Sequence, residues 1–128
     1  SPPIRTRIGW LLAFHGATTI EEGNVYSMGW CVLDLKNPET VRYVSDTPPL
    51  TPRAIYEFET GPIPQLDHSN FINGVQVVFA QGLVEVGDDL IVYYGAADVT
   101  VAGARVNKRS LIDSLERAIE LGQGGVPL

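Results

Sequence analysis

The apolar positions of the chain fall into short runs separated by turn residues. Ile8 to His15 and Asn24 to Leu35 are rich in aromatic and aliphatic residues, which is typical of buried strands. Gly16 to Gly23 is more polar and is predicted to link these two runs. Lys36 to Glu39 contains Asn and Pro, which favour a turn, and Val41 to Val44 follows as a third apolar run. The pattern predicts three strands in an antiparallel meander.

A second group of apolar runs repeats this organisation. Gln81–Gly82 and Gly87–Asp89 are predicted turns, because Gly and Asp favour turn conformations. The repeated order of strand and turn suggests a repeated blade. The predicted strands are Val75–Phe79, Leu83–Val86, Leu90–Tyr94 and Thr100–Val106.

The end of the chain has the periodicity of a helix. Ser110 is predicted to cap its first turn, with Asp113 three residues later completing a capping box. Gly122 suits the C-terminal stop, because glycine readily adopts the left-handed conformation found there. The apolar stripe consists of Leu111, Leu115, Ala118 and Ile119.

These elements predict one mainly all-β domain over residues 1–128 with a C-terminal α-helix. Its parts are a first meander at 1–46, a long proline-rich loop at 47–73, a second meander at 74–107 and the helix at 110–121. The absence of alternating helices excludes a doubly wound α/β fold. The residues alone leave open a small sandwich or two blades of a propeller. Isolated blades would expose a sheet edge.

Composition narrows the function. The 128 residues carry a formal net charge of −6, which disfavours nucleic acid as a partner. Arg5/Arg7 and Lys108/Arg109 are local positive spots that could still hold a small anion. No apolar stretch approaches the roughly 20 residues that a membrane helix needs, so no membrane partner is expected. The single cysteine, Cys31, excludes an internal disulfide and fits a cytoplasmic protein.

Five motifs follow one another along the chain. They are Gly9–Gly16 with its lead-in Pro2–Thr6, Tyr26–Gly29, Leu33–Pro38, Val77–Phe79 followed by Gly82, and Tyr93–Asp98. This ordered set resembles glycoside hydrolase family 130, the mannoside phosphorylases and related mannosidases. The resemblance covers nearly the whole chain and implies a five-bladed β-propeller, of which this chain forms about two C-terminal blades.

The resemblance also implies a chemistry. One carboxylic acid protonates the leaving oxygen of a β-mannoside while phosphate, or water in hydrolases, attacks in a single inverting displacement. In family members the acid lies in the N-terminal half, and the resemblance leads us to expect that this chain starts after it. We therefore expect no catalytic residue in this chain and an incomplete enzyme. No cofactor is implied beyond inorganic phosphate as co-substrate.

The same resemblance assigns four site residues. Arg5 and His15 are expected to bind phosphate, and Tyr94 and Asp98 to bind the sugar. Tyr93 and Tyr94 point to opposite faces of a strand, so one is expected in the core and the other exposed.

Other side-chain groupings are given no catalytic role. Asp67, His68 and Ser69 are adjacent in a loop and cannot converge on one reacting atom, so no hydrolytic triad is predicted. The two histidines lack metal-ligand spacing, so no metal site is predicted.

Two hypotheses remain at this point. The chain is a carbohydrate-active part of a β-mannoside phosphorylase or glycosidase, completed by an N-terminal propeller half. Alternatively, it is a non-catalytic carbohydrate-binding or self-assembling truncated propeller module, in which a homo-oligomer covers the open sheet edges. Small carbohydrate, phosphate or both are the expected ligands.

Overall fold

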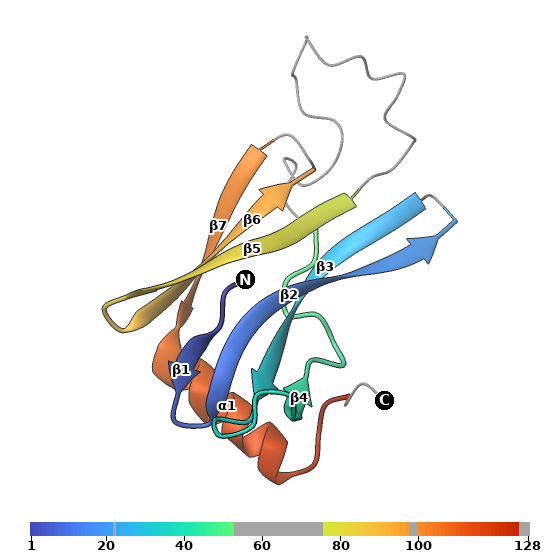
Figure 1. Ribbon diagram of the computed structural model, residues 1–128. Helices are drawn as coiled ribbons and strands as arrows, with labels where there is room; N and C mark the ends of the chain where they lie inside the picture. The colour runs from blue at the N-terminus through green and yellow to red at the C-terminus, as the bar shows by residue number, and fades with distance from the viewer. Residues whose placement is uncertain (22, 53–75, 98–99, 126–128) are drawn as a thin grey trace.

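The computed structural model describes residues 1–21, 23–52, 76–97 and 100–125 (Figure 1). The prediction of a mainly β chain with a C-terminal helix is confirmed. The elements are β1 Ile4–Thr6, β2 Gly9–Ile20, β3 Gly23–Leu33, β4 Val41–Val44, β5 Gln76–Val86, β6 Asp89–Ala96, β7 Thr100–Asn107 and α1 Lys108–Glu120.

The strands form two antiparallel groups that share one open sheet. The first meander comprises β1 to β4, and the second meander comprises β5 to β7. The sheet order is β1-β2-β3-β5-β6-β7, with β4 also paired to β3. A short parallel pairing of β3 with β5, Val25 to Gln76 and Tyr26 to Val77, joins the two groups. Figure 1 shows α1 crossing the lower end of both meanders.

The first hairpin is longer than predicted. The first five residues of the polar link expected at Gly16 to Gly23 are instead strand, because β2 continues to Ile20, which pairs with Gly23 of β3. Thr18 and Thr19 suit this extension, since β-branched residues favour strands. The Thr19 hydroxyl and the Asn24 side-chain oxygen lie 2.9 Å apart across the hairpin. The turn predicted at Lys36 to Glu39 is confirmed, with Thr40 N–H donating to the Asn37 carbonyl at 2.9 Å.

The prediction of a turn at Gln81–Gly82 is wrong. Residues on both sides belong to one continuous strand, β5, and its pairing with β6 shifts register between Ala80 and Gly82. This is a bulge, which takes up one extra residue without ending the ladder. The predicted turn after Val86 is confirmed, since β6 begins at Asp89.

The helix begins earlier than predicted and has a different cap. Asn107 is the N-cap, and its side-chain oxygen accepts a hydrogen bond from Ser110 N–H at 2.9 Å. Ser110 therefore lies inside the first turn, and Asp113 forms no capping box but binds Arg7. Gly122 ends the helix as predicted, with φ at +67°. Its N–H and that of Gln123 close the last turn on the Ile119 and Ala118 carbonyls.

The hydrophobic core lies between the two meanders and α1. Alternate residues of β6 point into it, from Leu90 to Ala96, as a half-buried strand requires. Cys31 on β3 is also buried, and burial raises the pKa of its thiol. The largest fully buried side chains are Leu11, Leu90, Val32, Val77, Val78 and Val92.

Only the start of the predicted loop at 47–73 belongs to the described residues. Its first part lies along β3, since Met28 N–H donates to the Leu50 carbonyl at 2.9 Å. Asp67, His68 and Ser69 lie outside the described residues. Within the described part of the chain, no helix is both long enough and apolar enough to cross a membrane.

Candidate functional site

Three aromatic side chains from three strands meet where the two meanders join. The His15 ring on β2 stacks on the Phe79 ring of β5, with ring centroids 3.5 Å apart and planes at 26°. The Tyr26 ring on β3 lies against Phe79 at 6.1 Å and 47°. We call His15, Tyr26 and Phe79 the aromatic cluster. It brings together three segments that the sequence analysis named separately.

Strand register fixes the positions of these rings. His15 lies opposite Met28 in the β2–β3 ladder, and Tyr26 lies opposite Val77 in the parallel β3–β5 pairing. Phe79 lies opposite Gly95 of β6, where a Cβ would make only an ordinary contact with the Phe79 Cβ, at 3.8 Å. Because each ring is half-buried, the cluster has both a packed side and an accessible side.

The end of β6 closes onto the same region. Ala97 has a φ of +49°, a left-handed conformation that non-glycine residues rarely adopt. Its N–H donates to the Val77 carbonyl at 3.2 Å, and the residue is buried. Such backbone conformations concentrate at functional sites. Asp98, predicted to bind sugar, follows directly but lies outside the described residues.

The two tyrosines of β6 differ as the strand alternation predicted. Tyr94 is 3% exposed and belongs to the hydrophobic core, whereas Tyr93 is 44% exposed. The assignment of Tyr94 to sugar binding stays a prediction.

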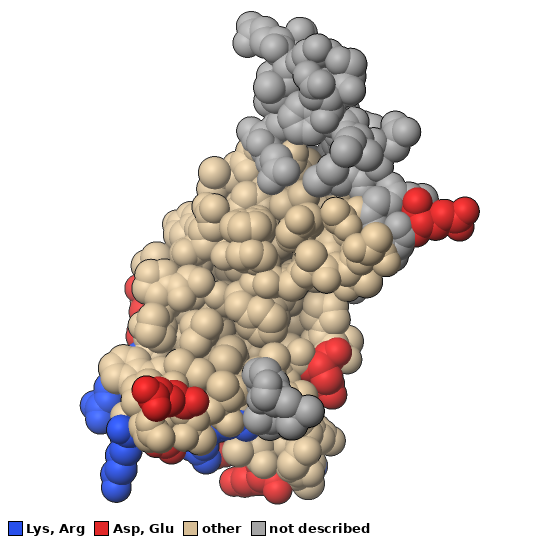
Figure 2. Space-filling view, turned by 45° about the vertical axis from the view of Figure 1, so that its right-hand side comes forward, with Lys and Arg blue, Asp and Glu red and all other residues tan. Residues whose placement is uncertain are grey.

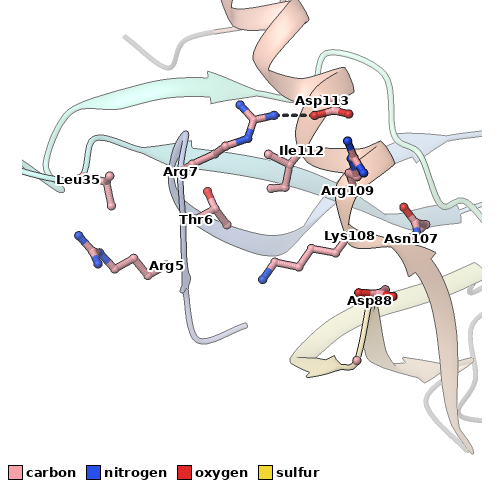
Figure 3. Close-up of a pocket in the computed structure, with 11 residues that line it drawn as sticks. Arg5, Thr6, Arg7, Leu35, Asp88, Asn107, Lys108, Arg109, Ile112 and Asp113 are labelled. Carbon is pink, nitrogen blue, oxygen red and sulfur yellow. Dashed lines mark hydrogen bonds and ion pairs between the residues drawn. The ribbon is translucent and has the colours of Figure 1, made fainter.

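A second site lies at the other end of the first meander, against the start of α1 (Figure 3). It is a pocket of about 770 Å³, which we call the basic pocket. Arg5 of β1 lines it, together with the turn between β5 and β6 and the first residues of α1. The lining residues are Arg5, Thr6, Arg7, Leu35, Gly87, Asp88, Asn107, Lys108, Arg109, Ile112 and Asp113.

The two residues predicted to bind phosphate do not share a site. Arg5 pairs with Trp10 of β2, and His15 lies five residues further along that strand. At the usual strand rise this is roughly 16 Å. His15 is not among the residues that line the basic pocket. Both phosphate assignments stay predictions, Arg5 for the basic pocket and His15 for the aromatic cluster.

Ion pairs connect the walls of the basic pocket. Arg7 binds Asp113 and Glu116 of α1, each at 2.5 Å. The hydrogen bond with Glu116 raises the pKa of the Arg7 guanidinium, and the contacts with Asp113 add to this effect. Lys108 binds Glu85 of β5, also at 2.5 Å. These pairs join the β1–β2 turn, β5 and α1 at one end of the molecule.

The sequence analysis named most of these residues without placing them together. Arg5/Arg7 and Lys108/Arg109 stood out as positive spots, but nothing in the sequence showed that they share one pocket. Tyr26 and Phe79 appeared only as parts of motifs, and Asp88 only within a predicted turn. Asn107 was not singled out, because Ser110 was the predicted cap. In the part of the chain that the structure describes, no three His, Cys, Asp or Glu side chains are placed to hold a metal ion.

Comparison with known proteins identifies the family. The family model described as beta-1,4-mannooligosaccharide phosphorylase matches residues 1–117. The chain belongs to glycoside hydrolase family 130. Among curated members of family 130, the chain is 40% identical over 114 residues to a beta-1,2-mannobiose phosphorylase of Listeria innocua. It is 38% identical over 112 residues to a beta-1,2-mannobiose phosphorylase of a Thermoanaerobacter species.

The family 130 chain matches only part of these relatives. The matches cover 89% and 86% of this chain but 28% and 32% of the two relatives. The solved structure of beta-1,2-mannobiose phosphorylase from Listeria innocua with beta-1,2-mannobiose is similar, with a TM-score of 0.69 and 40% identity. That match covers 90% of this chain and 28% of the solved chain.

Proposed function

We propose that this chain contributes sugar- and phosphate-facing residues to a site that cleaves β-mannosides, with inorganic phosphate as co-substrate. The aromatic cluster is the observation that supports this role best. It lies where the motifs of family 130 meet, at the junction of β2, β3 and β5. Proteins of the phosphorylase type match almost the whole described chain.

The chemistry of the cluster suits a sugar and an oxyanion. Aromatic faces pack against the apolar C–H faces of pyranose rings, and Tyr26 and Phe79 offer such faces. A stacked imidazole keeps its two ring nitrogens at the edge of the stack. His15 can therefore donate a hydrogen bond to a phosphate or sugar oxygen while Phe79 holds its ring plane.

The reaction that we propose is a single displacement. A carboxylic acid protonates the glycosidic oxygen while a phosphate oxygen attacks the anomeric carbon from the opposite face. The products are a shortened sugar and an α-linked mannosyl phosphate. In this scheme His15 orients phosphate, whereas Tyr94 and Asp98 contact the sugar. We assign the proton donor to no residue of this chain.

We further propose a β-1,2-linked mannoside as the substrate. Both curated relatives described above act on beta-1,2-mannobiose, whereas the family model carries the name of a β-1,4 enzyme. Comparing the two disaccharides therefore tests the linkage directly.

The architecture proposed for this site is about two blades of a five-bladed propeller. The two meanders and the likeness to the Listeria structure support this arrangement. A segment similar to the unmatched part of the longer relatives would supply the remaining blades. Alternatively, a homo-oligomer would cover the open sheet edges. A single domain, a cytoplasmic location and the absence of nucleic-acid and membrane partners stay predictions.

Binding to the cluster can be measured on this chain by NMR. Titration of the ¹⁵N-labelled chain with β-1,2-mannobiose or β-1,4-mannobiose, each with phosphate, should shift the His15, Tyr26 and Phe79 amides. The β-1,2 sugar should bind more tightly, and His15→Ala should abolish the response. Tyr93→Ala removes an exposed aromatic ring of β6 instead and should leave the ligand-induced amide shifts unchanged. Absence of any shift at millimolar ligand would contradict the proposal.

An assay of turnover distinguishes a role in catalysis from a role as a non-catalytic carbohydrate-binding module. We expect no mannosyl phosphate from this chain alone, because no proton donor is assigned to it. Co-expression with the part of the Listeria relative outside its matched region should restore phosphorolysis. Sugar binding without turnover in both experiments would instead favour the non-catalytic carbohydrate-binding module. Turnover by the chain alone would show that the proton donor is misassigned.

A further inference from the structure

The basic pocket differs in charge from the chain around it. Four cationic side chains line it, Arg5, Arg7, Lys108 and Arg109, against the two carboxylates of Asp88 and Asp113. The lining residues alone have two more positive than negative charges, and the ion-pair partners Glu85 and Glu116 beside the pocket balance them. The chain as a whole has a net charge of −6. On the face shown in Figure 2 the Lys and Arg side chains gather at the lower end, where α1 lies in Figure 1.

Two of the four cations have no acidic partner in the described residues. Arg7 is neutralised by Asp113 and Glu116, and Lys108 by Glu85. The side chains of Arg5 and Arg109 form no ion pair or hydrogen bond with any other residue that the structure describes. The pocket therefore has two guanidinium groups available to a ligand.

The walls of the pocket are held in place. On β1, the Thr6 hydroxyl is buried and donates to the Gly9 carbonyl at 2.6 Å, which fixes the turn after Arg5. The pairs of Arg7 with Asp113 and Glu116 connect this turn to α1. Figure 3 shows Arg5 on the β1 side and Lys108 and Arg109 at the start of α1, on either side of the pocket. In this view the Arg5 side chain extends away from α1, whereas the Lys108 ammonium extends toward β1.

We propose that the basic pocket is a second binding site, separate from the aromatic cluster, for the phosphate group of a small ligand. Planar guanidinium groups donate paired hydrogen bonds that match the geometry of phosphate oxygens. The pocket, at about 770 Å³, lies within the range of small-molecule sites, so it has room for a sugar phosphate as well as for free phosphate. The site extends beyond the proposed function, because His15 does not line it.

One residue of the basic pocket would repel a phosphate ligand, which provides a test of the proposal. Asp88 lines the pocket from the β5–β6 turn, and no described cation lies within ion-pair distance of its carboxylate. A negative charge there repels phosphate. Removal of that charge should strengthen binding, whereas removal of Arg5 or Arg109 should weaken it. If the pocket did not bind phosphate, substitution of Asp88 and substitution of the arginines would not change phosphate affinity in opposite directions.

The experiment is calorimetry of the whole chain with inorganic phosphate, mannose 1-phosphate and neutral mannose. The double variant Arg5→Gln/Arg109→Gln should lower phosphate affinity roughly tenfold or more, and Asp88→Asn should raise it by about threefold. Arg117→Gln removes one positive charge on α1 outside the pocket and should leave affinity within about twofold. Circular dichroism and thermal unfolding check that each variant is folded.

The ligands separate the two sources of the phosphate group. Equal affinity for both phosphates means that the site recognises phosphate alone, and tighter binding of mannose 1-phosphate means that it also holds the sugar. The proposal is overturned if neither phosphate binds saturably, or if the double variant binds as the unmodified chain does. His15→Ala should not change binding at this pocket. The test of the basic pocket is therefore independent of the function proposed for the aromatic cluster.

Discussion

The aromatic cluster and the basic pocket draw on the same two meanders but depend on different forces. The cluster is made of half-buried rings whose positions follow from the registers of β2, β3 and β5. The pocket is made of exposed charges that a short turn and several ion pairs hold together. Packing is little affected by salt, whereas exposed ion pairs are screened. The two sites should therefore respond differently to mutation, acid and salt.

The largest expected effect concerns the β1–β2 turn at the pocket end. Gly9 has a φ of +142°, and a Cβ there would lie 2.3 Å from the Leu33 carbonyl oxygen. Gly9→Ala should therefore destabilise the chain by about 3 kcal/mol, as measured by urea unfolding.

The matched control is Gly16→Ala in the same strand. A Cβ at Gly16 would meet no atom within 4 Å, so this variant should unfold close to the unmodified chain. Amide shifts in Gly9→Ala should be larger at Arg5 than at His15. If Gly9→Ala were no less stable than Gly16→Ala, the turn would not control the geometry of the pocket.

A moderate effect is expected at the aromatic cluster. Phe79→Leu removes the ring that stacks on His15 and should cost about 1 kcal/mol of stability. It should also move the ring protons of His15 downfield, because they no longer lie over an aromatic face. The chain has two histidines, so the His15 signals can be assigned with one His15→Asn variant.

Tyr93→Leu is the control for that measurement, since it removes an aromatic ring of β6 that is 44% exposed. It should leave the His15 signals in place. Unchanged His15 signals in Phe79→Leu would mean that the stack does not persist in solution. High salt should not alter either result, in contrast to phosphate binding at the basic pocket.

The smallest effect is expected from acid at Asp34, one residue before Leu35 of the basic pocket. The Asn37 and Lys36 N–H groups donate to its carboxylate, each at 2.9 Å, and these bonds lower the pKa of Asp34 below its ordinary value of 3.8. The stabilisation is therefore present above about pH 4 and is lost as pH falls through the lowered pKa. Asp34→Asn should flatten the dependence of stability on pH in that window.

Thermal unfolding between pH 2 and 6 measures this effect. Asp46→Asn is the comparison, since it removes an exposed carboxylate that accepts no such pair of backbone hydrogen bonds from the described residues. Equal acid profiles for both variants would show that the Asp34 turn does not contribute. As the pH falls, the amide chemical shifts near Leu35 should change before those near Phe79.

The sequence predicted the secondary structure well where apolar periodicity was strong. The runs around Leu11, Val32 and Val92 became strands, and the spacing of Leu111 and Leu115 became a helix. Its errors came from polar residues in regular structure. Thr18 and Thr19 extend a strand although they are polar, and Gln81 occupies a bulge that resembles a turn in sequence.

The candidate sites were harder to predict, because they depend on contacts between distant segments. Arg5 and Lys108 line one pocket although about a hundred positions separate them, and only the fold brings them together. The stack of His15 on Phe79 likewise depends on the pairing of β3 with β5, which no local pattern encodes. The motifs named the segments that would meet, but they did not predict which side chains would touch.

The buried Cys31 has a practical consequence for every one of these measurements. It is the only cysteine, it is 8% exposed, and it lies on β3 between Leu12 of β2 and Val44 of β4. Because Cys31 is buried and burial also raises the pKa of its thiol, an alkylating reagent should modify it slowly in the folded chain and faster when the first meander opens. The rate of thiol labelling therefore reports the opening of the first meander, without any substitution in the chain.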